Sequence, residues 1–183
     1  MPDATQWVTD TSVYTHLCRA GHADLLEALA PGGIILVPDD VDTEIKNGQA
    51  LHTGIPDVSA VTWAEVTVLT FDEVMTQMAV KGAMGGGPRD HLGECAVIAC
   101  ATHRQLIALI DDRAAITQAD ARDVVSHDTL WLVVEAYVTT LGYDQPRAAK
   151  VVDDLLATGM YLPIDSGESL FAWAYQEGLL PRP

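Results

Sequence analysis

Runs of apolar residues alternate with segments of helical periodicity along most of the chain. The continuous apolar run GIILV at residues 33–37 is typical of a strand that is buried on both faces of a parallel sheet. The same criteria predict five strands, at residues 6–9, 33–37, 61–70, 106–110 and 123–126. Helices are predicted from Ser12 onward and at residues 22–30, 41–46, 71–80, 91–104, 113–121 and 129–141. This alternation predicts an α/β fold whose open, mainly parallel sheet carries helices on both faces.

The C-terminal part of the chain departs from this alternation. Two consecutive helices are predicted there, at residues 146–158 and 168–177. The second carries Leu170, Phe171 and Trp173, which we expect to complete the core rather than to form a partner-binding face. Because no linker separates this part from the rest, we expect a single domain over residues 1–183. Residues 143–183 would form a C-terminal helical extension packed on it.

Charge limits the ways in which this chain can bind a polyanion. Its 183 residues include 26 Asp and Glu against 10 Lys and Arg, which gives a net charge of −16 at pH 7. Such a chain does not hold nucleic acid through bulk electrostatic attraction. With 49% hydrophobic residues it is also too apolar to be disordered. We therefore expect a folded protein whose carboxylates are placed for particular purposes.

The sequence offers little support for a membrane, disulfide or zinc protein. No stretch has the apolar length of a membrane span, and residues 1–9 lack the basic start and apolar run of a signal peptide. We therefore expect a cytoplasmic protein with no membrane partner. The three cysteines, Cys18, Cys95 and Cys100, are odd in number and lack zinc-ligand spacing, so neither a disulfide framework nor a cysteine-based zinc site is expected.

Acidic residues follow two of the predicted strands. Asp10 ends the first strand, and Asp111 and Asp112 end the fourth. Ligands of open α/β sheets bind outside the carboxyl ends of the strands, so these acids could share one metal ion. An Asp before a helix is also a favoured N-cap. One N-cap would explain one member of the pair at residues 111–112, but not both.

Two further acids lie on predicted helices. Glu94 is the only charge within an otherwise apolar stretch of the helix HLGECAVIACATHR, which predicts a carboxylate buried at a cost of several kcal/mol unless it is paired or bound to metal. Asp90 could reach the same face, although it is better placed as the N-cap of that helix. Glu44 lies about 60° from the inward face of its short helix, and spacing alone indicates a solvated residue.

Four segments in this order resemble the PIN-domain nucleases, a family that includes the toxins of many bacterial toxin–antitoxin pairs. They are TDTSV at residues 9–13, VPDDVDTEI at 37–45, GECAVIACA at 93–101 and LIDDRAA at 109–115. The C-terminal GMYLP and SLFAWA are similar to the end of one PIN subgroup, so the resemblance spans nearly the whole chain. It implies a three-layer α/β/α sandwich with a central, mainly parallel sheet of about five strands.

The resemblance also implies a metal site for RNA cleavage. By position, its four acids are Asp10, Glu44, Glu94 and Asp112. Many members have Asp in the central helix where this chain has Glu94, a departure that the subgroup shares. Secondary candidates are Thr11 or Ser12, which match the hydroxyl residue after the first acid, together with Asp111 and Asp90.

Carboxylates that converge repel one another unless a cation lies between them, and oxygen ligands without Cys or His suit Mg²⁺ or Mn²⁺. The reaction expected of such a site is metal-assisted hydrolysis of a phosphodiester. We expect Asp10 and Asp112 to be the principal ligands, with Glu94 completing the site and Glu44 acting through water. Arg113 and Lys46 are the candidates for contact with substrate phosphate.

Other functions remain open at this point. The expected partners are RNA, an antitoxin protein and a second copy of the chain. The main alternative is a catalytically silent PIN-like module that acts by binding a protein, whereas phosphatase and receiver domains fit the order of the acids poorly. The glycine-rich GAMGGGPRD is not a nucleotide-binding P-loop, because Pro88 stands where such a loop has its lysine.

Overall fold

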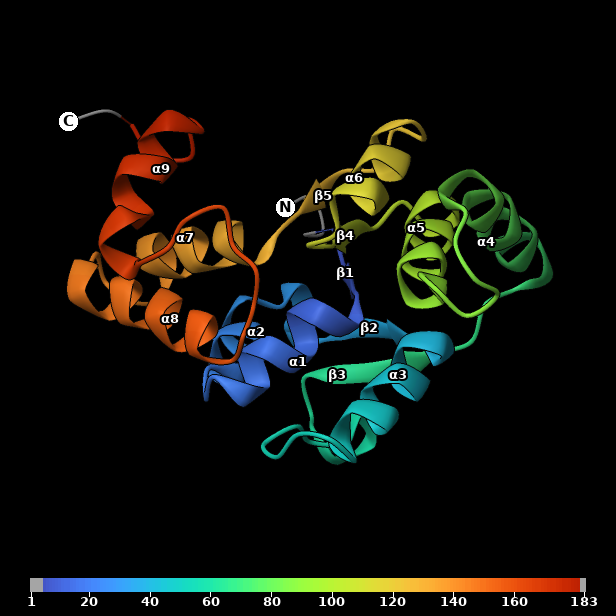
Figure 1. The fold of residues 1–183 in the computed structure, drawn as a ribbon, viewed down its shortest axis with the longest axis horizontal. Coiled ribbons are helices and arrows are strands. Elements are labelled where there is room, and N and C mark those ends of the chain that lie inside the picture. The colour runs from blue at the N-terminus through green and yellow to red at the C-terminus, as the bar shows by residue number, and fades with distance from the viewer. Residues whose placement is uncertain (1–4, 182–183) are drawn as a thin grey trace.

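A five-stranded parallel sheet lies at the centre of the molecule. The computed structural model describes residues 5–181, so the ends of the expected 1–183 domain and part of the 1–9 stretch examined for a signal peptide lie outside it. The sheet has the order β3-β2-β1-β4-β5, and every pair is parallel. Its strands are β1 (Trp7–Thr9), β2 (Ile35–Pro38), β3 (Ala64–Thr67), β4 (Ile107–Leu109) and β5 (Ser126–His127). The expected mainly parallel sheet of about five strands is confirmed (Figure 1).

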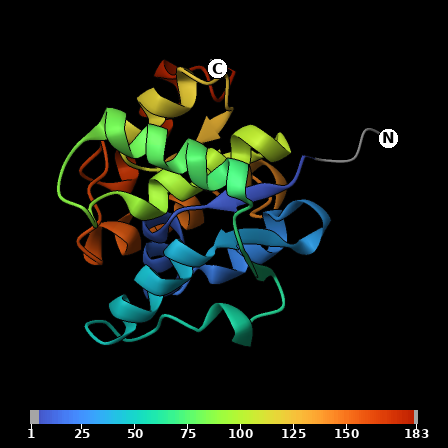
Figure 2. The same ribbon diagram turned by 90° about the vertical axis from the view of Figure 1, so that its right-hand side faces the viewer.

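Helices cover both faces of this sheet and make a three-layer α/β/α sandwich (Figures 1 and 2). The helices that connect the strands are α1 (Thr11–Arg19), α2 (Ala23–Leu29), α3 (Asp39–Gln49), α4 (Phe71–Met84), α5 (Leu92–Arg104) and α6 (Arg113–Asp120). Helix α5 packs directly on β1, β2 and β4, and α4 lies on its outer side. Short 3₁₀ turns occur at η1 (Pro31–Gly33) and η2 (Val58–Ala60).

The C-terminal part adds three helices beside the sheet. They are α7 (Thr129–Thr139), α8 (Gln145–Ala157) and α9 (Leu170–Gln176), with the turn η3 (Gly167–Ser169) between the last two. Helix α7 packs against α2 and α8, and η3 packs against α8. Among residues 5–181, none of the helices combines the length and the apolar character needed to cross a bilayer.

Two strand predictions were wrong in their bounds. The strand expected at residues 61–70 is only Ala64–Thr67, and the strand expected at 123–126 lies at Ser126–His127. Both strands are at the edges of the sheet, where apolar runs are weaker because one side lacks a neighbouring strand. Helix α4 continues to Met84, so it includes the first residues of the glycine-rich GAMGGGPRD segment.

After each of three strands, an aspartate caps the next helix. Asp10 accepts a hydrogen bond from the Val13 N–H (2.8 Å) and begins α1, and Asp112 accepts one from the Ala115 N–H (2.8 Å) and begins α6. Asp128 accepts one from the Trp131 N–H (2.7 Å) and begins α7. Because the strands are parallel, these caps place three carboxylates along one edge of the sheet.

Candidate active site

A cleft of 680 Å³ opens at the carboxyl edge of the sheet. One wall comes from the starts of α1, α5, α6 and α7. The other wall comes from residues 160–163 and α9, and we call it the C-terminal wall. Its polar side chains are Ser12, Glu94, Asp111, Asp112, Arg113, Asp128 and Glu177. The edge that the sequence predicted for ligand binding is therefore hollow and mainly acidic.

Asp10 is buried beside this cleft and is 2% exposed. Its Oδ1 accepts the Val13 N–H, and its Oδ2 accepts the Asp111 N–H at 3.3 Å. Burial raises the pKa of the Asp10 carboxyl well above its usual range, and the neighbouring Asp111 charge raises it further. Asp10 is thus a carboxylate that gains from a nearby cation.

Asp111 and Asp112 have different roles, although they are adjacent in sequence. Asp112 caps α6, whereas Asp111 accepts hydrogen bonds from the N–H and the hydroxyl of Thr129, both at 2.9 Å. Burial raises the pKa of Asp111 to about 6. Only one of the two acids is therefore an N-cap, as expected from the sequence. It is Asp111, rather than Asp112, whose backbone contacts Asp10.

Glu94 lies in the first turn of α5, where the cleft meets the helix. Its side chain is 23% exposed, so the expectation of a helix buried on all sides was wrong at this turn. The pKa of Glu94 is raised, first by burial and then by the charge of Glu44. The Nδ1 atom of His91 lies 3.8 Å from its Oε1 atom. Glu94 lines the same wall of the cleft as Asp111 and Asp112, and its charge also raises the pKa of Asp10.

Glu44 reaches the start of α5 from the neighbouring helix α3. Its carboxylate accepts hydrogen bonds from the hydroxyl of Thr11 and from the Gly93 N–H, the latter at 3.1 Å. A Cβ atom at Gly93 would lie 2.6 Å from the Glu44 Oε2 atom, so only glycine permits this approach. Glu44 is not a solvated helix residue, as its spacing alone indicated, but a link between α1, α3 and α5.

The sequence and this architecture point to one family. A family model described as a PIN domain matches residues 6–171. The chain belongs to the PIN-domain family. PIN domains are generally nucleases that bind nucleic acid and use divalent metal ions. No curated protein matches the sequence.

The candidate ligands of this PIN domain are of the chemical type that binds a hard divalent cation. Asp111, Asp112 and Glu94 line the cleft and Asp10 is buried beside it, and carboxylate oxygens are ligands that Mg²⁺ and Mn²⁺ prefer. Within residues 5–181, no three His, Cys, Asp or Glu side chains are close enough together to hold a metal ion as they stand. Closing a ligand set would require these carboxylates to move toward one another.

Several predicted site residues lie apart from the cleft of this PIN domain. Asp90 does not cap α5, because His91 occupies the N-cap in a left-handed conformation. The Asp90 carboxylate instead accepts the Gly87 N–H at 2.6 Å in the preceding turn. Lys46 forms an ion pair with Asp42 at 2.6 Å. Of the two cations predicted to contact phosphate, only Arg113 lines the cleft.

Sequence reasoning missed four residues that line the cleft. Asp128 follows β5 as Asp10 follows β1, and a correctly placed fifth strand would have revealed it. Trp173, Tyr161 and Glu177 come from the C-terminal wall. Leu170 is buried, and Phe171 and Trp173 are partly buried and pack against the core as expected, while Trp173 also lines the cleft. Their position depends on how the C-terminal part packs, which no local pattern encodes.

Proposed function

We propose that this protein is a divalent-metal-dependent endoribonuclease that hydrolyses RNA phosphodiester bonds. The observation that carries the proposal is the group of buried and half-buried acids at the carboxyl edge of a PIN-domain sheet. Burial and mutual repulsion raise the pKa values of Asp10 and Glu94. The free-energy cost of keeping these carboxylates ionised is offset when a cation binds between them.

We assign a separate role to each group of residues at the cleft. Asp10, Glu94, Asp111 and Asp112 would hold Mg²⁺ or Mn²⁺. A bound divalent ion of this kind lowers the pKa of a water ligand and stabilises negative charge on the phosphate. Glu44, held by Thr11 and Gly93, would position the first turn of α5 and with it Glu94. Arg113 would contact a phosphate oxygen, because it is the basic side chain that lines the cleft.

The test is an RNA cleavage assay with the full chain. Structured and single-stranded RNAs are incubated with Mg²⁺, Mn²⁺ or EDTA, and the products are separated on a gel. We expect cleavage with either metal and none with EDTA. Glu94→Gln and Asp10→Asn should lower the rate at least 100-fold, and Asp72→Asn, an exposed acid on α4, should leave it unchanged.

Asp10 also caps a helix, so each variant's unfolding is measured beside its activity. A loss of cleavage counts only in a variant that remains folded at the assay temperature. Asp10→Asn that is folded and cleaves RNA at the wild-type rate in Mn²⁺ would refute the proposed ligand set. Absence of cleavage by the wild type with both metals would refute the nuclease activity itself.

The second candidate function is a catalytically silent module that binds a protein. Two observations favour it: Glu44 and Asp111 are already engaged by hydrogen bonds within the protein, and α4 exposes an apolar ridge. That ridge consists of Phe71, Met75 and Met78, which are 78%, 51% and 63% exposed. Isothermal titration decides between the two functions, because a silent module takes up no Mn²⁺.

A narrower form of the proposal makes this nuclease a cytosolic toxin with an antitoxin partner. The support is the resemblance of its acidic segments to toxins of the family, together with the apolar ridge on α4. A small DNA-binding protein encoded beside this chain would be the expected antitoxin. Co-expression of that protein should suppress the RNA cleavage defined above, and failure to do so would favour a nuclease that acts alone.

A further inference from the structure

The acidic cleft continues into a second cavity of 250 Å³. The two spaces share four lining residues, Ile116, Asp128, Trp173 and Glu177. The second space then extends along β5 and the start of α7, as far as His127 and Trp131. The two cavities therefore form one groove, which leads away from the acids toward the C-terminal wall. We call it the C-terminal groove.

Aromatic side chains line the whole length of the C-terminal groove. Trp173 is half-buried and lines both cavities, and the rings of His127 and Trp131 are stacked at 3.7 Å with an interplanar angle of 7°. Tyr161 is 82% exposed at the rim, although Met160 and Leu162 on either side of it are buried. The fold thus holds a large aromatic ring in solvent beside the cleft, without using it for packing.

The C-terminal wall is anchored to α8 at η3. The Gly167 N–H donates to the Asp153 carboxylate at 2.7 Å, which ties η3 to α8. A Cβ atom at Gly167 would lie 2.0 Å from the Ala149 carbonyl oxygen, so the two backbones are in direct contact. With Leu170 fully buried, the wall packs as part of the folded protein.

Charge separates the two parts of the groove. Arg113 lines the first cavity only, whereas Asp128 and Glu177 line both. A phosphate in the second cavity would meet carboxylates and no arginine from the lining, and would be repelled. An uncharged planar group with N–H donors meets an aromatic face and acceptor oxygens at the junction of the two cavities, where Asp128, Trp173 and Glu177 line both. Carboxylates are the acceptors that suit the exocyclic amine of cytosine.

We propose that the C-terminal groove binds a nucleobase of single-stranded RNA beside the reaction centre. Tyr161 and Trp173 provide the stacking surfaces, and Asp128 and Glu177 accept hydrogen bonds from an exocyclic amine. This subsite rests on the proposed function, and it gives that function a substrate class: unpaired RNA with cytosine preferred over uracil next to the cleaved bond. Base stacking on aromatic side chains is the general means by which proteins hold unpaired strands.

The test measures binding separately from cleavage. The probes are 5′-labelled hexamers of cytidine or uridine with cleavage-resistant phosphorothioate linkages, and fluorescence anisotropy gives the Kd in Mn²⁺. We expect the cytidine hexamer to bind about fivefold more tightly than the uridine hexamer. Tyr161→Ala and Trp173→Ala should each raise the Kd about tenfold. Tyr161→Phe should bind as the wild type does, because the ring remains.

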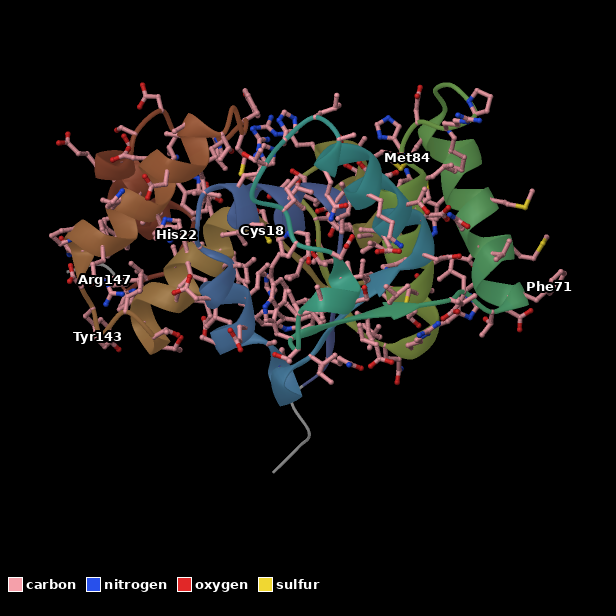
Figure 3. The ribbon with its side chains drawn as sticks, turned by 90° about the horizontal axis from the view of Figure 1, so that it is seen from below. Cys18, His22, Phe71, Met84, Tyr143 and Arg147 are labelled. Atoms are coloured by element: carbon pink, nitrogen blue, oxygen red, sulfur yellow. The ribbon has the colours of Figure 1, made fainter. Side chains whose placement is uncertain are left out.

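Two controls make the result specific to the groove. Phe71→Ala removes an aromatic ring from α4 whose exposure is comparable to that of Tyr161. Phe71 lies at the opposite end of the molecule from Arg147 of α8 (Figure 3). This variant should not change the Kd. Glu177→Gln replaces an acceptor by a group that also donates, and should abolish most of the preference for cytidine. Thermal unfolding verifies that Trp173→Ala, the variant nearest the core, is folded.

The outcomes separate this proposal from the proposed function. RNA cleavage together with a Kd that is independent of Tyr161 and Trp173 overturns the base subsite and leaves the nuclease standing. Binding that depends on both rings without cleavage supports the subsite and overturns the nuclease. A wild type that binds neither hexamer overturns the base subsite, and the cleavage assay alone decides the nuclease.

Discussion

Each acid at the carboxyl edge of the sheet serves the fold as well as the cleft. Asp10, Asp112 and Asp128 all use Oδ1 to cap a helix, and Asp111 orients the start of α7 through Thr129. These hydrogen bonds fix the rotamers of the carboxylates before any ligand arrives. Because the carboxylates must move toward one another to close a ligand set, a bound cation has to compensate for any of these hydrogen bonds that it weakens.

Gly93 offers the sharpest test at the scale of a single residue. In Gly93→Ala, the new methyl group would displace the Glu44 carboxylate from the Gly93 N–H. Because the displaced atoms are at the end of a flexible side chain, we expect the free energy of unfolding to fall by only about 1 kcal/mol. Metal-dependent RNA cleavage should fall at least tenfold, because Glu44 no longer orders the first turn of α5.

Gly82→Ala is the matched control, since a Cβ atom at Gly82 in α4 meets nothing within 4 Å. Alanine should stabilise that helix by roughly 0.5–1 kcal/mol and leave cleavage unchanged. Urea unfolding and the RNA assay measure both effects. Wild-type cleavage by Gly93→Ala would show that the contact between Glu44 and α5 is structural only.

The elements show what the sequence could predict and where it failed. Strands β1, β2 and β4 were predicted because central parallel strands are continuous apolar runs. The edge strands β3 and β5 were misplaced because β3 is half-exposed and β5 has only two residues. Acids that follow a central strand could be found in the same way. The contact of Glu44 with Gly93 could not, because it joins residues 49 positions apart.

Helices α4 and α5 are joined by an ion pair that gives the fold an acid-sensitive link. Glu73 of α4 is buried, and its carboxylate accepts hydrogen bonds from Arg104 at 2.6 and 2.9 Å and from the Thr70 N–H at 2.7 Å. The Arg104 guanidinium is the main cause that lowers the pKa of Glu73 to about 2. A lowered carboxyl pKa stabilises the folded state at neutral pH, and that stability is lost as the pH falls from about 5 to 2.

Glu73→Gln should therefore lower the free energy of unfolding by about 2–3 kcal/mol at pH 7. The difference from the wild type should shrink by about half at pH 3, because the Glu73 carboxyl of the unfolded chain is then protonated while that of the folded protein is still mostly ionised. Urea unfolding at the two pH values measures this difference in the free energy of unfolding. Glu65→Gln, at an exposed position of β3, should show no difference at either pH, and an equal loss at both pH values for Glu73→Gln would contradict the assignment.

On the scale of the whole molecule, the distribution of charge decides how RNA can bind. Two divalent ions would offset only four of the sixteen net negative charges. Among the basic residues that the structure describes, Arg104 pairs with Glu73 and Lys46 pairs with Asp42, while Arg113 lines the cleft. Metal ions and base stacking, rather than a basic surface, must therefore supply most of the affinity.

Because the affinity for RNA depends on bound metal ions, the Kd should change with metal and with salt. With the phosphorothioate cytidine hexamer, the Kd in Mn²⁺ should be at least tenfold lower than in EDTA. Folded Asp10→Asn should lose most of that gain, and Asp72→Asn should keep it. Raising the salt from 50 to 200 mM should weaken the residual binding in EDTA, because the few protein–phosphate contacts are exposed to counterions. Tight binding in EDTA would contradict this account, since it would require a basic surface that the chain's charge does not provide.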